Sequence, residues 1–178
     1  MLTATTLIAR GLVALKVLVV NGPAMRKVTR SLLQSIGVRT IYEATDGRSG
    51  LHAICTLRPD VVVLDWEIPS LSGPQVMRAV RAPNEFPRPD VPVIMLTCCG
   101  ERSLVLEAVN LGVNELLLRP VSSQALLARF ISIIANPRRM VRIGDYYGPE
   151  PRRRFSVKSK SGIRAGHGRS FIAFHDGN

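Results

Sequence analysis

Short runs of apolar, mostly β-branched residues alternate with amphipathic helical patterns over the first 135 residues, and this alternation constrains the fold more than any other feature. The first run, Val17–Val20, ends at the turn-forming residues Asn21, Gly22 and Pro23. A fully apolar run of this length is typical of a strand that is buried on both faces. From Met25 the apolar residues instead recur with helical spacing, which predicts a helix after the strand.

The same alternation recurs four more times along the chain. Further strands are predicted at 40–43, 61–64, 93–97 and 115–118, and further helices at 47–57, 72–81, 102–111 and 122–135. Strands that alternate with helices predict an α/β fold with a doubly wound, five-stranded parallel sheet and helices on both faces. Ligands of such folds bind beyond the carboxyl ends of the strands.

The predicted elements and the charge together divide the chain into three parts: a lead-in over 1–15, a folded domain over 16–135 and a tail over 136–178. The first 135 residues hold 14 Lys and Arg against 10 Asp and Glu, whereas the tail holds 10 against 3. Because Arg10 interrupts the first apolar run, we expect 1–15 to be a flexible lead-in rather than a secretory signal.

The composition predicts a cytoplasmic protein. No stretch of 18 apolar residues exists that could form a membrane-spanning helix. The three cysteines cannot form a disulfide framework, and no Cys-x-x-Cys pair indicates a zinc site. A reducing compartment is the simplest interpretation of this cysteine usage.

The basic tail over 136–178 is expected to be largely disordered, because it is rich in Arg, Lys, Ser and Gly. Residues 170–174 could form one short strand, and Tyr146, Tyr147 and Phe155 could instead anchor the first part of the tail on the domain. Three roles remain open for the tail: a solvated extension, docking onto an acidic partner, and nonspecific contact with nucleic-acid phosphates.

Three polar side chains lie at the carboxyl ends of neighbouring predicted strands. Asp65 ends the third strand, Thr97 ends the fourth, and Arg119 follows the fifth. A carboxylate at a strand end can accept a phosphoryl group as a nucleophile. A hydroxyl and a guanidinium beside it can bind the phosphoryl oxygens. Phosphoryl chemistry is therefore one function that this arrangement predicts.

With these residues in place, residues 16–135 resemble the receiver domain of two-component response regulators, in particular the chemotaxis type. The resemblance is carried by VVVLDWEIPSLSG at 61–73, VPVIMLT at 91–97 and LLLRPVSSQALL at 116–127. It implies a flavodoxin-like (βα)5 fold. It also implies that Asp65 is the phosphoacceptor, that Thr97 is the switch hydroxyl, and that Arg119 stands where the family has a lysine, before a proline. Glu67 matches the position whose backbone carbonyl ligates magnesium.

The sequence departs from the family at the acidic pair that normally follows the first strand and holds Mg²⁺. Asn21 and Gly22 occupy this place, and the alternative alignment on Val20 and Asn21 supplies no carboxylate either. Magnesium binding at Asp65 is therefore predicted to be weak. The Glu67 side chain could replace one of the missing carboxylates.

Arg119 and Leu116 are two further departures from the family. Arg119 could occupy the metal space and form an ion pair with Asp65, or its side chain could point into solvent. Receivers usually carry Tyr or Phe where this chain has Leu116, so leucine lacks the aromatic group that follows the switch hydroxyl. Both departures weaken the expectation of ordinary phosphorylation-dependent switching.

Partner surfaces are expected on the last predicted helix, where Leu126 and Ile133 form a second apolar stripe. The stripe is either part of a broad core face or a surface for a partner or a homodimer.

The expected function is a non-enzymatic, single-domain response regulator whose output is protein–protein contact. It would receive phosphate at Asp65 from a histidine kinase or phosphotransfer protein and contact a downstream signalling protein, although its magnesium site is impaired. A phosphorylation-independent pseudo-receiver adaptor is the alternative. A nucleic-acid-binding protein that acts through its tail is a further alternative.

Overall fold

A computed structural model describes residues 4–152, and a parallel sheet forms the centre of this part of the chain. The sheet contains β1 (Lys16–Val20), β2 (Thr40–Ala44), β3 (Val61–Asp65), β4 (Val93–Thr97) and β5 (Glu115–Leu118). Its strand order is β2-β1-β3-β4-β5, and every neighbouring pair is parallel. The carboxyl ends of all five strands therefore meet at one edge, where the sequence predicts the functional site.

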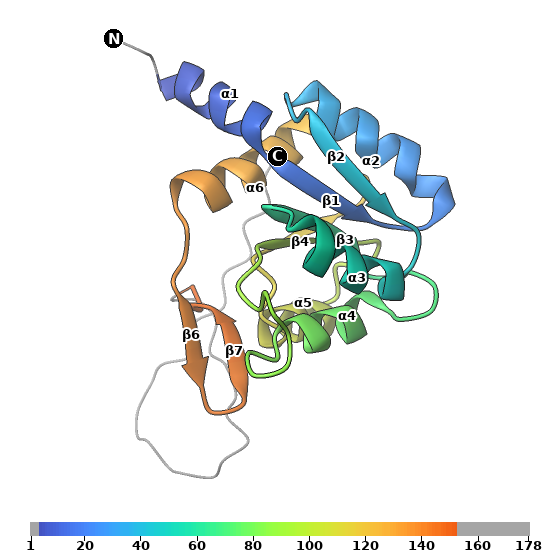
Figure 1. Ribbon diagram of the computed structural model, residues 1–178, viewed down its shortest axis with the longest axis vertical. Helices are drawn as coiled ribbons and strands as arrows, with labels where there is room; N and C mark the ends of the chain where they lie inside the picture. The colour runs from blue at the N-terminus through green and yellow to red at the C-terminus, as the bar shows by residue number, and fades with distance from the viewer. Residues whose placement is uncertain (1–3, 153–178) are drawn as a thin grey trace.

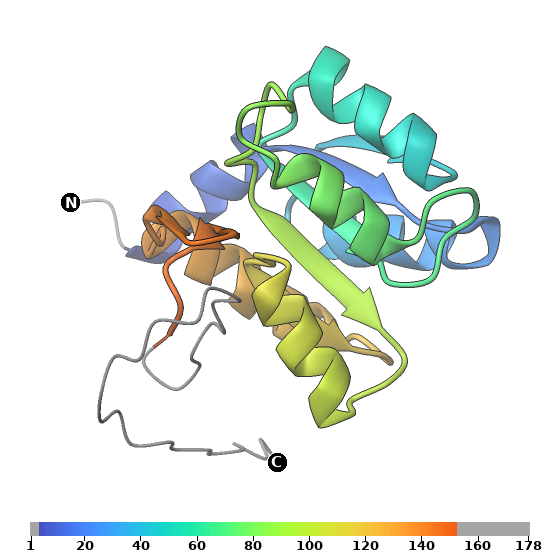
Figure 2. The same cartoon turned by 90° about the horizontal axis from the view of Figure 1, so that it is seen from below.

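Helices cover both faces of this sheet (Figure 2). The helices are α1 (Ala4–Ala14), α2 (Pro23–Ser35), α3 (Gly47–Leu57), α4 (Gly73–Val80), α5 (Arg102–Asn110) and α6 (Ser123–Ala135). The core on the α3–α4–α5 face includes Leu18, Val62 and Met77. The core on the opposite face includes Val17, Val63 and Phe130 and is covered by α2 and α6. The expected flavodoxin-like, doubly wound α/β fold is confirmed.

Successive residues of β1 show why the internal strands of the sheet are almost entirely apolar. Val17 and Val19 contribute to one core and Leu18 and Val20 to the other, and all four are fully buried. Side chains alternate between the two faces of a strand, so a strand that is covered on both sides needs an apolar residue at every position.

The N-terminal residues differ from the flexible lead-in that the sequence predicts. Residues 4–14 form α1, which contacts α6 and projects beyond the sheet (Figure 1). Leu12 is only 3% exposed and belongs to the core on the α6 side. Most of the stability of a helix in a protein comes from packing its apolar side chains against other elements, and the local sequence pattern does not show this packing. The expectation of a flexible segment is therefore wrong for residues 4–14.

The first part of the C-terminal tail also differs from the expected disorder. β6 (Met140–Ile143) and β7 (Tyr146–Pro149) form an antiparallel hairpin after α6 (Figure 1). Gly144 has φ 58° in its turn, a conformation that glycine adopts without steric cost. Tyr146 is 6% exposed, which agrees with the suggestion that the tyrosines anchor the tail. Phe155 and the short strand considered at 170–174 lie outside the described residues.

None of the helices among residues 4–152 has the length and apolar character that a membrane-spanning helix requires.

Candidate functional site

The structure brings together the three predicted strand-end residues Asp65, Thr97 and Arg119. Asp65 is the last residue of β3, and its neighbour in the β3–β4 pairing is Leu96, one residue before Thr97. Arg119 directly follows β5, and its backbone N–H donates to the Thr97 carbonyl oxygen at 2.8 Å. The Asp65 and Thr97 residues are 2% and 3% exposed, so a carboxylate and a hydroxyl are buried at this edge.

Arg119 forms an ion pair with Asp65, between Nη2 and Oδ1. Burial raises the pKa of the Asp65 carboxyl above its ordinary value, although the adjacent guanidinium opposes this shift. Burial alone would lower the pKa of Arg119, but Asp65, together with Cys98, outweighs it and raises that pKa. The guanidinium therefore remains charged and supplies the positive charge that the buried carboxylate faces.

The Thr97 hydroxyl is engaged by the loop that follows β4 rather than by Asp65. Thr97 Oγ1 accepts a hydrogen bond from the Cys99 backbone N–H at 3.1 Å and lies 3.3 Å from the Cys99 carbonyl oxygen, to which it can donate. Arg119 Nη1 lies 3.9 Å from the Cys98 sulfur. Arg119 thus spans from the Asp65 carboxylate to the loop that holds Thr97.

Asn21 and Gly22 directly follow β1, the position at which the acidic pair is expected. Asn21 is fully buried, and its Nδ2 donates to Thr29 Oγ1 at 3.0 Å. Within the described residues its Oδ1 has no hydrogen-bond partner. Gly22 has no side chain and serves as the N-cap residue of α2. The end of β1 therefore carries a neutral amide and no carboxylate.

Glu67 lies two residues after Asp65 but is exposed, and its negative charge contributes to raising the Asp65 pKa. Among residues 4–152, no three His, Cys, Asp or Glu side chains come together in a group that could hold a metal ion.

A comparison with known protein families identifies this arrangement. The family described as "Response regulator receiver domain" matches residues 17–131. The chain belongs to the response regulator receiver family. The matched residues include all three strand-end residues and all of the parallel sheet except Lys16, so the chain carries the domain of two-component signalling. Receiver domains in general transmit signals rather than catalyse reactions on other molecules.

Curated relatives of this receiver domain include chemotaxis proteins. The chemotaxis protein CheY of Pseudomonas aeruginosa is 33% identical over 113 residues, which are 63% of this chain and 90% of that protein. The chemotaxis protein CheY-3 of Vibrio cholerae is 31% identical over 113 residues, 63% of this chain and 85% of that protein.

Among solved structures, a Francisella response regulator receiver domain is 28% identical, with a TM-score of 0.57. That match covers 65% of this chain and 93% of the other. A putative response regulator from Chloroflexus aurantiacus is 25% identical, with a TM-score of 0.62, and the match covers 68% of this chain and 98% of the other.

The backbone around Asp65 is packed closely against the start of α4. The Gly73 N–H donates to the Trp66 carbonyl oxygen at 2.9 Å. A Cβ atom added at Gly73 would lie 2.4 Å from the Asp65 carbonyl oxygen, so the receiver domain needs glycine here. This contact is the structural reason for the glycine in the segment that carries Asp65.

The expected partner stripe on α6 needs correction at Leu126. Leu126 is 1% exposed and lies in the core beside Phe130, because α6 turns this side chain toward the sheet. It is not available to a partner. Ile133 is half-buried and packs against the same core, so only its remaining surface could contact a partner. Leu116 likewise packs against the other core.

Sequence reasoning missed two buried charged residues, Arg81 and Glu115. Arg81, at the end of α4, is 7% exposed and donates to the Gly112 and Val91 carbonyl oxygens at 3.0 Å and to Asn114 Oδ1 at 2.9 Å. Glu115, at the start of β5, is 5% exposed. Local sequence carries no signal for either role, because their partners come from distant segments.

Proposed function

We propose that this receiver domain is a protein-interaction module of two-component signalling that works without magnesium-dependent phosphorylation of Asp65. The observation that carries the proposal is the ion pair between Arg119 and Asp65. A guanidinium that binds the carboxylate neutralises the charge that a cation would otherwise neutralise. The Asp65 side chain is then held in one arrangement whether or not a metal ion is supplied.

The residues around Asp65 do not fit a magnesium ion. Magnesium prefers carboxylate and water oxygens in octahedral geometry. Asn21 supplies one neutral amide oxygen, Gly22 supplies no side chain, and Glu67 is exposed. Asp65 is therefore the single buried carboxylate among these four residues, and it already faces a cation.

The cost of the missing carboxylates supports the same conclusion. One carboxylate at ~4 Å from a divalent ion contributes up to ~8 kcal/mol at an effective dielectric constant of ~20. Water ligands recover part of this attraction. A quarter of it, lost twice, is still ~4 kcal/mol, which corresponds to about a thousandfold weaker binding.

A phosphate-accepting regulator is the second candidate function, and the buried pair of Asp65 and Thr97 at neighbouring strand ends favours it. In that case a histidine kinase or phosphotransfer protein would be the phosphate donor. In both candidates the output is contact with a downstream signalling protein, and both share the receiver family. They differ in whether Arg119 releases the Asp65 carboxylate so that a metal cation can bind it.

A titration that follows the emission of Trp66 separates the two candidates. Trp66 is the single tryptophan of the chain, is partly buried and adjoins Asp65. We expect no saturable change when magnesium and then beryllofluoride are added in the low millimolar range. A saturable change that is absent from the Asp65→Asn variant would refute the proposal and favour the phosphate-accepting regulator.

A further inference from the structure

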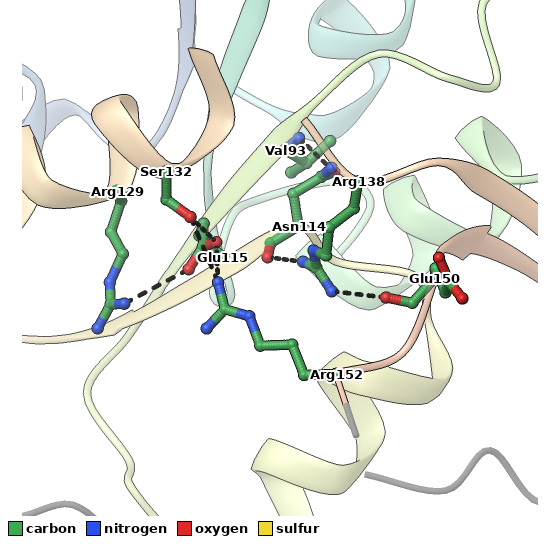
Figure 3. A network of polar contacts seen from close by, with 8 residues as sticks. All are labelled: Val93, Asn114, Glu115, Arg129, Ser132, Arg138, Glu150 and Arg152. Atoms are coloured by element: carbon green, nitrogen blue, oxygen red, sulfur yellow. Dashed lines mark hydrogen bonds and ion pairs between the residues drawn. The ribbon is translucent and has the colours of Figure 1, made fainter. Parts of the chain in front are cut away.

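The start of β5 carries a buried carboxylate that two segments of the chain neutralise together (Figure 3). Glu115 accepts a hydrogen bond from Ser132 Oγ at 3.0 Å, and Arg129 Nη1 lies 3.5 Å from its other oxygen. Both of these partners belong to α6. Arg152, from the chain after β7, forms an ion pair with Glu115 Oε1. Arg152 is thus the one of these partners that lies outside the (βα)5 domain.

The hairpin that leads to Arg152 is packed on the loop between α5 and β5. A Cβ atom added at Gly148 would lie 2.6 Å from the Gly112 Cα, so the two backbones are in direct contact. Arg138 donates to the Asn114 and Glu150 carbonyl oxygens, which joins the two ends of the hairpin to this loop. The extension is therefore seated on the domain at both ends.

A cavity of about 150 Å³ lies between the extension and the face formed by α5, β5 and α6. Val105, Val109 and Leu116 contribute apolar walls to it, and Arg152 and Pro151 contribute walls from the extension. The extension therefore covers an apolar part of this face.

The ion pair of Arg152 with Glu115 is the contact of the extension that can form and break most readily. Its side chain is 48% exposed, whereas that of Glu115 is 4% exposed. A half-exposed arginine leaves its partner readily, and salt screens the attraction. Loss of Arg152 would leave the buried Glu115 carboxylate with too little compensating charge, because Arg129, at 3.5 Å, is a weak substitute.

We propose that the chain's own extension, residues 138–152, is a releasable cover of the α5–β5–α6 face, and that the ion pair between Arg152 and Glu115 is the latch that holds it in place. The extension must leave before another protein can use the covered part of this face. The latch lies at the amino end of β5, whereas Asp65 lies at the carboxyl edge of the sheet. The inference is therefore independent of the chemistry at Asp65.

Amide hydrogen exchange of the full chain tests the latch. In Arg152→Glu we expect exchange of residues 140–149 to accelerate by about fivefold or more, with a smaller increase over 104–118. Residues 17–20 of β1 should exchange as in the wild type, because the central sheet stays intact. Arg142→Ala removes an exposed hairpin arginine that has no ion-pair partner among the described residues, and it should change nothing.

A double-mutant cycle shows whether the effect passes through Glu115. Glu115→Gln should itself loosen the hairpin, and Arg152→Ala should then add little to it. Unchanged exchange of 140–149 in Arg152→Glu, or equal effects of Arg152→Ala with and without Glu115→Gln, would overturn the latch.

A measurement of self-association shows whether the extension or a second copy of the chain occupies this face. The wild type should stay monomeric by sedimentation velocity under conditions that protect the hairpin. A wild-type dimer whose residues 104–118 become protected as concentration rises would assign the face to a second copy instead, and would also overturn the proposal.

Discussion

Arg119 Nη2 and Asp65 Oδ1 form an ion pair at the carboxyl edge of the sheet, at the point where relatives of this domain are expected to hold a metal ion. The Asp65 side chain is 3% exposed and that of Arg119 is 16% exposed. A buried carboxylate needs a compensating charge. In this receiver domain the chain supplies that charge itself, one residue after β5.

The stability of Asp65→Asn should depend on pH relative to the wild type. Burial raises the pKa of Asp65 in the folded chain, so ionisation of this group opposes folding as pH rises through the folded-state pKa. We expect Asp65→Asn to unfold at a higher urea concentration than the wild type at pH 7. The difference should shrink toward zero below the ordinary carboxyl pKa of 3.8.

Asp46→Asn provides a control of opposite sign for this pH series. Hydrogen bonds from the Ser49 backbone and side chain lower the pKa of Asp46, so its charge stabilises the fold above the unfolded pKa. This variant should be less stable than the wild type at pH 7, with the difference lost as pH falls. A destabilised Asp65→Asn at pH 7 would contradict the account of Asp65.

Restoring the missing carboxylates should restore magnesium binding. The triple variant Asn21→Asp, Gly22→Asp, Arg119→Lys adds two negative charges and removes the competing guanidinium. We expect magnesium affinity to rise by at least tenfold and up to about a thousandfold, measured by Trp66 emission. The same substitutions with Asp65→Asn form the matched control, and equal binding in both would place the ion elsewhere.

Gly73→Ala should destabilise the domain by about 1–3 kcal/mol, because overpacking forces the backbone to shift. The new Cβ would meet the Asp65 carbonyl oxygen at 2.4 Å and the Trp66 Cα at 3.0 Å, and neither is a flexible side chain. Gly100→Ala is the control, since its Cβ would meet only the Leu118 side chain, at 3.4 Å. Urea unfolding measures both, and equal stability of the two variants would refute the close contact.

Arg81→Met should destabilise the fold by about 3 kcal/mol or more, because it leaves several buried acceptors without a donor. Burial lowers the pKa of Arg81 to about 10, so the side chain stays charged at neutral pH. Arg78→Met on the same helix breaks only an exposed ion pair with Glu107 and should cost less than about 1 kcal/mol. Thermal unfolding compares the two, and similar losses would show that Arg81 contributes no more than a surface pair.

The three internal strands β1, β3 and β4 could be predicted because each is covered on both faces, which requires continuous apolar runs such as Val61–Leu64, whereas the edge strands β2 and β5 are only partly buried. The strand-end position of Asp65, Thr97 and Arg119 followed from the parallel topology alone. Leu126 was misplaced because α6 is apolar on more than one side, and helical spacing alone does not decide which stripe faces the sheet.

Segments that depend on distant partners were harder to predict. α1 is stabilised by contact with α6, at the other end of the domain. The hairpin depends on Gly148 against Gly112 and on Tyr147 against Asp90, contacts that no local pattern reports. Its one local signal was the Gly144–Asp145 turn between two short apolar-containing runs. Buried Glu115 had no signal, because its partners Ser132 and Arg152 lie far along the chain.

Acetyl phosphate supplies the most direct test of the central claim that Arg119 replaces a metal ion at Asp65. The full chain is incubated with acetyl phosphate, with and without magnesium, and its intact mass is followed over time beside Asp65→Asn. We predict no prompt gain of a phosphoryl group in either condition. A rapid, acid-labile phosphoryl adduct that requires magnesium and is absent from Asp65→Asn would contradict the account.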